Sequence, residues 1–227
     1  MRVRKHMPLI LARKIRSAYY RYDFESAFII GQQGYGKTTY AMLVLYELYD
    51  GDWDKVLQHV VFDPQEILPR FKEALKTGKR IKAVVFDDAG LHLSKYLIHT
   101  GEQGFKLTMV INALFNLIRT ICAGVIFTSP DMDVLKELRK KSWIVGTPAA
   151  PHGKNAPYRQ MLLFRKTIHP SGRVYVAKIG VDEYRLDVIP RDVRKQYEEK
   201  RKAAMEPLLN RLEELLEKQK KQKQQTV

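Results

Sequence analysis

Residues 31–38 read GQQGYGKT and follow the apolar run AFII, residues 27–30, without a break. A glycine-rich turn between a strand and a helix can point several backbone N–H groups inward as a cradle for an anion. Three glycines permit the close approach that such a cradle needs: Gly31, Gly34 and Gly36. In the pattern G-x-x-x-x-G-K-[ST], which Lys37 and Thr38 complete, the lysine reaches the outer phosphates of a nucleotide and the hydroxyl ligates Mg²⁺. The alternative is an ordinary glycine turn between core elements.

The sequence on both sides of this loop supplies the context that the pattern requires. Residues 27–30 are apolar and partly β-branched, which predicts a short strand. Residues 37–49 place four apolar side chains on one helical face: Ala41, Val44, Leu45 and Leu48. We therefore predict ATP and Mg²⁺ as ligands, contacted by the loop and the next threonine: Gly31, Gln32, Gln33, Gly34, Tyr35, Gly36, Lys37, Thr38 and Thr39. The roles of Gln32, Gln33 and Tyr35 stay open between the outer face of the loop and contact with a neighbouring subunit.

The length and composition limit the class of protein. A chain of 227 residues is long enough for one main α/β domain with attachments. Its single cysteine, Cys122, excludes a disulfide framework and lies in an apolar stretch, which predicts core packing and a reducing compartment. No apolar run approaches the length of about 18 residues that a transmembrane helix needs. We therefore expect a soluble, cytoplasmic protein without stable membrane insertion.

The net charge of +15 is concentrated in two segments. Residues 1–22 hold seven Lys and Arg side chains and residues 138–181 hold nine, and neither segment contains an acid. Such a distribution is typical of a surface that binds a polyanion, and we predict DNA as the partner. Two alternatives stay open. The basic residues can simply solvate two faces, or a basic amphipathic helix can bind an anionic membrane surface.

Apolar strands alternate with helices between residues 25 and 146, which predicts a parallel sheet with helices on its faces. The predicted strands lie at residues 27–30, 59–62, 80–86, 124–129 and 143–145. The predicted helices lie at residues 9–22, 37–49, 64–76, about 105–121, and from Asp131 onward. Residues 91–104 are polar and contain glycines, which predicts a mobile loop before the fourth of these helices.

The pattern changes at residue 147. Residues 147–157, TPAAPHGKNAP, predict a loop, and two strands joined by the turn HPSG predict a β-hairpin after it. Aromatic residues among the basic side chains of this hairpin can stack on exposed bases or face the core. A charged helix is predicted from Pro190 to about residue 219, before a low-complexity, disordered ending. The predicted domains are a basic N-terminal helix, a nucleotide-binding core, a basic hairpin extension, and a charged helix with its tail: residues 1–24, 25–146, 147–190 and 191–227.

The strand AVVFDD, residues 83–88, ends in two acids, Asp87 and Asp88. Ligand crevices form at the carboxyl ends of parallel strands, so this pair is expected to face the glycine-rich loop. Asp87 would hold Mg²⁺ together with Thr38, and Asp88 would orient or deprotonate the attacking water, as phosphoryl transfer requires. The alternative role for paired acids at a strand end is helix capping.

These motifs together resemble ATPases of the additional-strand P-loop class, which includes the AAA+ and RecA-like groups. The resemblance covers about residues 25–146 and rests on GQQGYGKT, on VVFDD, and on a strand that ends in Thr128 and Ser129. It implies an α/β P-loop NTPase sheet with a centrally inserted strand. It also implies that Thr128 or Ser129 senses the γ-phosphate. Many members of the class carry glutamate where this chain has Asp88, whereas helicase loaders often carry paired aspartates, so hydrolysis is expected, with slower turnover.

A narrower resemblance rests on FDPQEILPRFKEALKTGKR, VVFDDAG and LIRTICAGVIFTSPD. These runs are similar to small ATPases of archaeal viruses and conjugative plasmids, which are related to replication initiators and helicase loaders or to DNA translocating and packaging motors. ATPases of the class usually complete the site with an arginine from the neighbouring subunit. Arg119 and Arg139 are the candidates for this role.

The sequence thus predicts a Mg²⁺-dependent ATPase that assembles on DNA as a homo-oligomer, a ring or a filament, and remodels or translocates it. The predicted catalytic residues are Lys37, Asp87, Asp88, Thr128, Arg119 and Arg139. The main alternative is a nucleotide-dependent partition or switch protein that acts on a protein partner. A small-molecule kinase and a membrane-associated assembly ATPase also stay open.

Overall fold

The computed structural model describes residues 8–88, 116–130 and 142–225. The chain divides into two compact units, Met1–Ile189 and Pro190–Val227. The second unit contains one 35-residue helix, α8 (Arg191–Gln225), with Pro207 inside it. Because this helix continues well past residue 219, the predicted disordered ending is wrong for most of its length. In the described ranges, no helix combines the length and the apolar character needed to cross a membrane.

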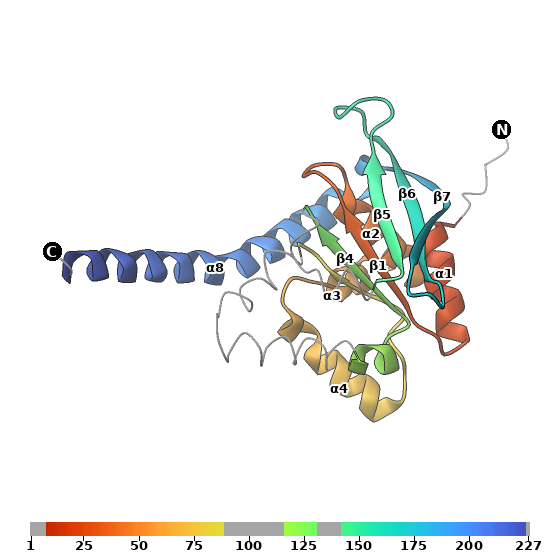
Figure 1. Ribbon diagram of the computed structural model, residues 1–227, viewed down its shortest axis with the longest axis horizontal. Helices are drawn as coiled ribbons and strands as arrows, with labels where there is room; N and C mark the ends of the chain where they lie inside the picture. Colours follow the sequence, from red (N-terminus) through yellow and green to blue (C-terminus); the bar gives the residue numbers. More distant parts are fainter. Residues whose placement is uncertain (1–7, 89–115, 131–141, 226–227) are drawn as a thin grey trace. The chain divides into compact units, whose positions relative to one another are not determined.

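The first unit is built on one seven-stranded sheet (Figure 1). In spatial order its strands are β2 (Val60–Val61), β3 (Val84–Phe86), β4 (Gly124–Ser129), β1 (Glu25–Ile30), β5 (Ile144–Ala149), β6 (Tyr158–Ile168) and β7 (Val174–Arg185). The first five strands in this spatial order pair in parallel, and β6 and β7 extend the sheet in antiparallel pairing. This mixed sheet confirms the predicted α/β class and the predicted hairpin. β4 lies between β1 and β3, where the P-loop resemblance places an inserted strand.

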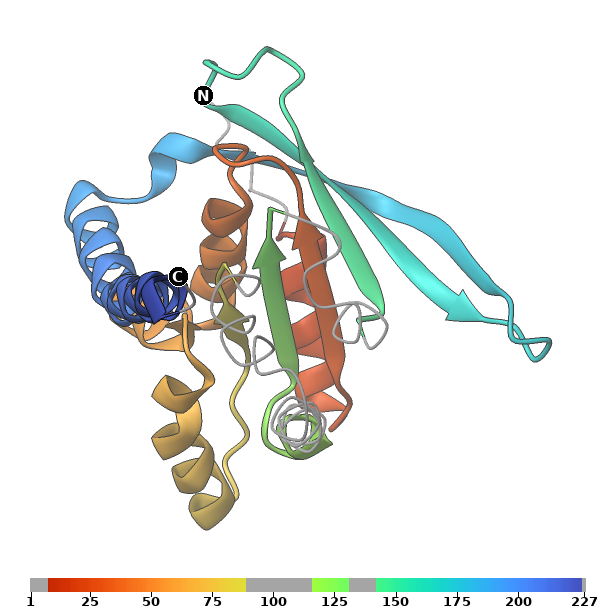
Figure 2. The ribbon, with the colours of Figure 1, turned by 60° about the vertical axis from the view of Figure 1, so that its left-hand side comes forward.

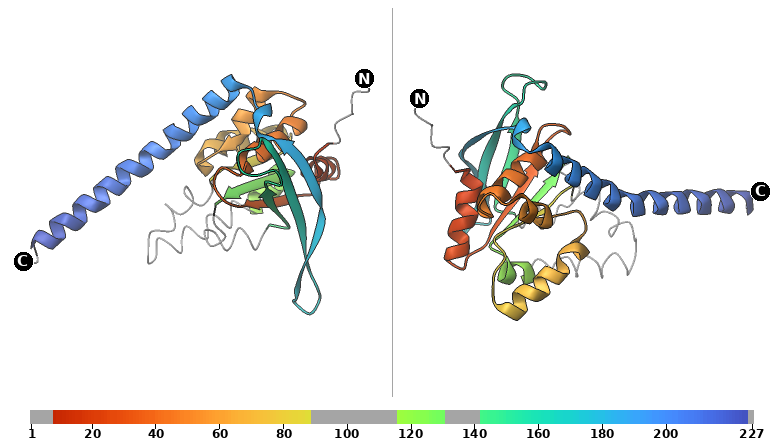
Figure 3. Two further views of the ribbon diagram at one scale, coloured as in Figure 1. Left: turned by 90° about the horizontal axis from the view of Figure 1, so that it is seen from above. Right: turned by 180° about the vertical axis from the view of Figure 1, so that it is seen from behind.

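Helices α1 (Ile10–Tyr20) and α2 (Lys37–Leu48) cover one face of the sheet and lie side by side (Figure 3). The apolar side of α1 is buried, so the basic N-terminal helix is docked on the core as predicted. Its Ile15 packs on Gly124 of β4, where an added Cβ would come within 2.6 Å of the isoleucine side chain. The predicted helix at residues 9–22 ends earlier, at Tyr20, so Tyr22 lies beyond it and is 83% exposed.

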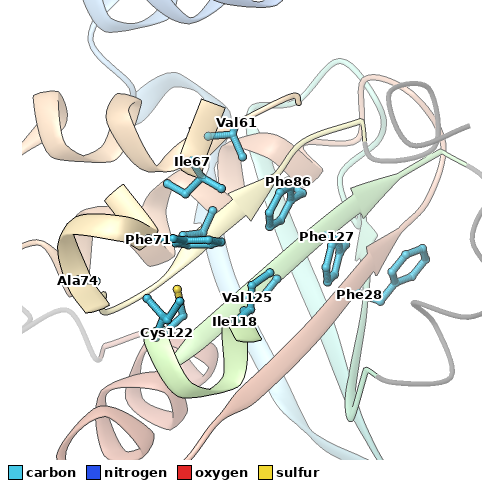
Figure 4. Close-up of a cluster of buried hydrophobic side chains, with 12 residues drawn as sticks. Phe28, Val61, Ile67, Phe71, Ala74, Phe86, Ile118, Cys122, Val125 and Phe127 are labelled. Atoms are coloured by element: carbon cyan, nitrogen blue, oxygen red, sulfur yellow. The ribbon is translucent and has the colours of Figure 1, made fainter. Parts of the chain in front are cut away.

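The other face of the sheet carries a core of phenylalanines (Figure 4). The rings of Phe86 and Phe127 stack with centroids 5.3 Å apart, and Phe71 of α4 packs into the same cluster. Further short elements among the described residues of this unit are α3 (Trp53–His59), η1 (Pro64–Ile67), α4 (Leu68–Thr77), a helical turn at residues 116–121 and η2 (Leu186–Val188). Gly78, which is left-handed with φ 67°, ends α4 as the sequence predicts, because glycine has no Cβ to clash there.

Cys122 lies in this second core and is fully buried, which confirms its predicted packing role. Burial raises the pKa of its thiol, because the thiolate would lose its hydration. The reactive form is therefore scarce in the folded protein. We expect the native protein to react with a thiol reagent at least about a hundredfold more slowly than the urea-unfolded chain, since the core must open first. Equal rates in the two states, measured by absorbance, would contradict this placement.

Strand β5 differs from its prediction. It runs from Ile144 to Ala149 rather than over residues 143–145, because all six of its residues pair with β6. The hairpin of β6 and β7 therefore continues the central sheet and extends past the start of β5 (Figure 2). Three predictions lie outside the described residues: the loop at residues 91–104, the first part of the helix at 105–121, and the helix from Asp131.

Candidate active site at the glycine-rich loop

The glycine-rich loop connects β1 to α2 and has the backbone that its glycines predict. Gly34 and Gly36 have φ values of 80° and 88°, in the left-handed region that favours glycine. Gly36 is also the N-cap of α2, and an added Cβ there would come within 2.4 Å of the Leu186 side chain. The loop therefore meets the two requirements of a phosphate cradle, which are a tight glycine turn and a helix N-terminus at its end.

Lys37 is the first residue of α2 and its side chain folds back over the loop. Its ammonium Nζ donates hydrogen bonds to the carbonyl oxygens of Gly31, at 2.7 Å, and Gln32, at 3.0 Å. The residue is only 7% exposed. A buried cation beside the partial positive charge of a helix N-terminus creates a site that favours an anionic ligand.

Thr38 and Asp87 come together from two separate elements, as the sequence predicts. Thr38 Oγ1 donates to Asp87 Oδ1 at 2.9 Å and lies 3.1 Å from Oδ2. Asp87 directly follows β3 and is fully buried. The strand order explains the meeting, because β3 and β1 both end at the edge of the sheet where the loop lies. Two of the hard oxygen ligands that Mg²⁺ prefers thus lie within hydrogen-bond distance of each other.

Thr128, the predicted phosphate sensor, is buried beside Asp87 at the end of β4. Its hydroxyl donates to Asp87 Oδ1 and accepts a hydrogen bond from the backbone N–H of Asp88 at 3.0 Å. This hydroxyl therefore holds the carboxylate of Asp87 and the backbone of Asp88. Its predicted contact with a γ-phosphate stays a prediction, as does that of the buried Ser129 beside it.

Asp88 has an unusual backbone. Its φ of 46° lies in the left-handed region, which costs a non-glycine residue roughly 1–2 kcal/mol. The hydrogen bond from its N–H to Thr128 helps to hold this conformation. Strained backbone of this kind occurs often at functional sites, where the surrounding structure fixes the orientation of a side chain. The side chain of Asp88 is half-buried, unlike that of Asp87.

The outer wall of the loop comes from residues that the sequence assigned to a separate extension. Tyr184 of β7 donates its hydroxyl to the carbonyl of Gly36 at 3.2 Å. Pro148 of β5 lies 3.0 Å from the position of a Cβ on Gly31. The ammonium of Lys154 lies 5.9 Å from the centroid of the Tyr35 ring, which gives Tyr35 a neighbour within its own chain. Strands β5 to β7 therefore support the loop.

Arg159 holds this wall in place. It is only 1% exposed, and its guanidinium donates to the backbone carbonyls of Lys154, Ala156 and Tyr158. The sequence counted Arg159 among the cations of a DNA-binding face, and burial removes it from that surface. Arg165 pairs with Glu25 at 3.1 Å, so a second cation of the hairpin is also used inside the protein. The two-residue period of a strand places Arg159 on the same face as the buried Met161 and Leu163, and this was the signal that could have predicted its inward position.

The structure describes one of the two predicted arginine fingers, Arg119, and places it away from the loop. Arg119 is exposed in the helical turn at residues 116–121, before β4 begins, whereas the loop lies where the strands end. It could approach a loop only in a neighbouring chain, which is the role that was predicted. Arg139 lies outside the described residues. Gln32 and Gln33 are exposed at the tip of the loop.

Comparison with families of known proteins gives no matching family model. Among solved structures, FlaH, a flagellar accessory protein from Methanocaldococcus jannaschii, covers 78% of this chain and 96% of its own at 12% identity and a TM-score of 0.38. The N-terminal domain of zonular occludens toxin from Neisseria meningitidis covers 70% of this chain and 95% of its own, at 12% identity and a TM-score of 0.36.

Two viral proteins have similar sequences. ORF286 of Acidianus two-tailed virus is 36% identical over 112 residues, which is 49% of this chain and 38% of that protein. Protein B-251 of Sulfolobus spindle-shape virus 1 is 34% identical over 222 residues, which is 92% of this chain and 86% of that protein. The chain therefore belongs to the same protein family as B-251 of this spindle-shaped virus.

Proposed function

We propose that this protein is a Mg²⁺-dependent ATPase. The observation that carries the proposal is the pairing of Thr38 with Asp87 beside a glycine-rich loop that Lys37 closes. Oxygen ligands, a buried cation and a helix N-terminus are the groups that bind a nucleotide with its metal ion. They come from separate elements, and the strand order brings them to one edge of the sheet.

The residues divide the work of phosphoryl transfer. Thr38 and Asp87 would hold Mg²⁺, which when bound neutralises charge on the phosphates. Lys37 leaves the carbonyls of Gly31 and Gln32 to pair with the outer phosphates. Asp88 orients or deprotonates the attacking water. Thr128 fixes the carboxylate of Asp87 and the backbone of Asp88. An arginine of a neighbouring chain, Arg119 or Arg139, stabilises charge in the transition state in a ring or a filament.

DNA is the polymer on which this ATPase acts in our proposal, by remodelling or translocation during viral or plasmid replication, packaging or transfer. The support is charge: the chain carries +15, and several cations of the two acid-free segments are exposed. Among the described residues of these two segments, the exposed cations are Arg13, Arg21, Lys154, Arg173 and Lys178. The chain belongs to the same family as a viral protein, which supports a role on viral DNA.

A second candidate is a nucleotide-dependent partition or switch protein that acts on a protein partner. One observation favours it. Ile168, Val174 and Val176 project from the hairpin and are each about 60% exposed, a surface that suits a protein more than a phosphate backbone. Stimulation of ATP turnover by a protein rather than by DNA would select this candidate.

The test is ATP turnover of the full chain with Mg²⁺ or a chelator, and with or without DNA. We expect turnover only with Mg²⁺, and a several-fold increase with DNA. DNA affinity should fall steeply with salt, by a slope of about 0.9 for each phosphate neutralised on a duplex. An inactive wild type would overturn the enzyme proposal. A flat salt response would overturn the phosphate contacts and leave the nucleotide site standing.

A further inference from the structure

A cluster of tyrosines and cations lies at the edge of the sheet opposite the glycine-rich loop. We name it the tyrosine ledge, and it consists of Tyr19, Tyr20, Arg21, Tyr22, Lys79, Arg80 and Arg119. It forms where α1 ends, α4 ends and the helical turn at residues 116–121 precedes β4 (Figure 1). β1 separates it from the loop, because Phe24 precedes this strand and Gly31 follows it. Six residues of strand span roughly 20 Å.

Two adjoining hollows on the tyrosine ledge provide space for a ligand. One of about 280 Å³ is lined mainly by Tyr19, Tyr20 and Lys79. The other, of about 510 Å³, includes Arg119 and Asn116 in its lining. Tyr22 and Arg80 line both hollows. The surface is therefore continuous, with aromatic rings at one end and polar groups at the other.

The tyrosine rings are presented to solvent and do not complete the core. Tyr20 is 74% exposed and Tyr22 is 83% exposed. Tyr22 has φ 56°, a left-handed conformation in which a bulky residue is a rare outlier. The hydrogen bond from the N–H of Asp23 to the carbonyl of Ala18, at 2.8 Å, closes the turn that imposes it. Glycine or asparagine would fit this turn at lower cost, so a tyrosine here suggests a use for its ring.

Arg80 makes the ledge rigid and basic. Its guanidinium lies 5.7 Å from the centroid of the Tyr22 ring, and its Nη2 donates to the carbonyls of Asp23 and Cys122, both at 2.8 Å. Its Nε and Nη1 have no hydrogen-bond partner among the described residues. Arg21, Lys79 and Arg119 add three more cations, which are exposed, and Asp23 is the single acid in the lining of the two hollows.

We infer that the tyrosine ledge binds single-stranded nucleic acid, with its rings stacked on unpaired bases and its cations on the phosphates. Stacking on aromatic side chains combined with a basic track is how proteins bind single strands with little sequence preference. A duplex offers no free base faces between its stacked pairs, so the rings favour the single strand. The inference rests on the proposed action on DNA. It places a contact far from the nucleotide site of the same chain and apart from the basic hairpin, and it leaves Arg139 as the candidate for the arginine finger.

The experiment measures binding of the full chain to a short fluorescein-labelled oligothymidylate and to a matched duplex by anisotropy. We expect Tyr20→Ser and Tyr22→Ser each to weaken binding of the single strand about tenfold, with a smaller effect on the duplex. Tyr22→Phe keeps the ring and should bind as the wild type does. Lys79→Ala should weaken binding and reduce its salt dependence by about one phosphate.

Matched controls separate this surface from others. Lys55→Ala removes an exposed cation from α3 and should leave binding unchanged. Tyr175→Ser removes an exposed ring from the hairpin and tests that second surface separately. If the tyrosine variants bind like the wild type while Tyr175→Ser does not, the ledge inference falls and DNA binding by the hairpin stands. A wild type that binds anionic vesicles but no oligonucleotide also overturns it, whereas ATP turnover, measured in parallel, tests the proposed enzyme separately.

Discussion

Replacing Lys37 with alanine is expected to lower ATP turnover about a thousandfold, the upper range for removing one preorganised charge-stabilising group from an active site. Lys37 is 7% exposed and its ammonium lies over the loop, so its charge acts with little screening by water. The carbonyls of Gly31 and Gln32, which accept its hydrogen bonds, lie on a partly exposed loop and can turn to water instead. The variant should therefore fold normally and lose transition-state stabilisation.

A matched lysine provides the control for this result. Lys55→Ala makes the same change in charge, but the side chain is 57% exposed and pairs with Asp52 on α3. We expect its turnover to equal that of the wild type. Turnover is measured by phosphate release at saturating ATP, with thermal unfolding recorded for both variants. A Lys37→Ala variant that keeps wild-type turnover would remove the glycine-rich loop from the mechanism.

The sequence predicted the meeting of Thr38 and Asp87 beside the glycine-rich loop because local rules govern it. The spacing of GQQGYGKT defines a loop whose glycines occupy left-handed backbone, and the alternation of strands and helices predicts that Asp87 ends beside it. Parallel strands share one edge for their carboxyl ends, so Thr38 and Asp87, 49 residues apart, needed no long-range information to be paired.

The wall of the loop could not be predicted in the same way. Tyr184 and Pro148 reach the loop only because β5 to β7 continue the central sheet, and a sequence pattern shows a hairpin without showing which strand it joins. For a related reason, the net charge of residues 138–181 overstated the number of cations that are free to bind a polyanion. Arg159 is buried under the loop wall, and Arg165 pairs with Glu25.

Asp182 of β7 is the residue whose loss should cost the fold most, and no pattern in the sequence marked it. It is 6% exposed, and its carboxylate accepts the backbone N–H of Ile10, at 2.9 Å, and the hydroxyl of Tyr40, at 2.6 Å. Asp182 therefore links the first turn of α1 to α2 and to β7, the outermost strand of the sheet. Burial, and then the negative charge of Asp182, raise the pKa of Tyr40, so its hydroxyl stays protonated and donates at all ordinary pH values.

Asp182→Ala is expected to lower the free energy of unfolding by about 3 kcal/mol, because two buried donors lose a charged acceptor. Tyr40→Phe leaves the N–H of Ile10 bonded and should cost about half as much, and Asp182→Asn, which keeps one acceptor oxygen, should fall between them. Urea unfolding followed by tryptophan fluorescence measures the change, since both tryptophans, Trp53 and Trp143, lie in the first unit. Tyr40 lies in the first turn of α2, directly after the glycine-rich loop. Because Asp182→Ala removes the hydrogen-bond acceptor of Tyr40, this variant should also bind ATP more weakly. Equal stability of Asp182→Ala and the wild type would show that the Asp182 carboxylate does not contribute to holding α1 in place.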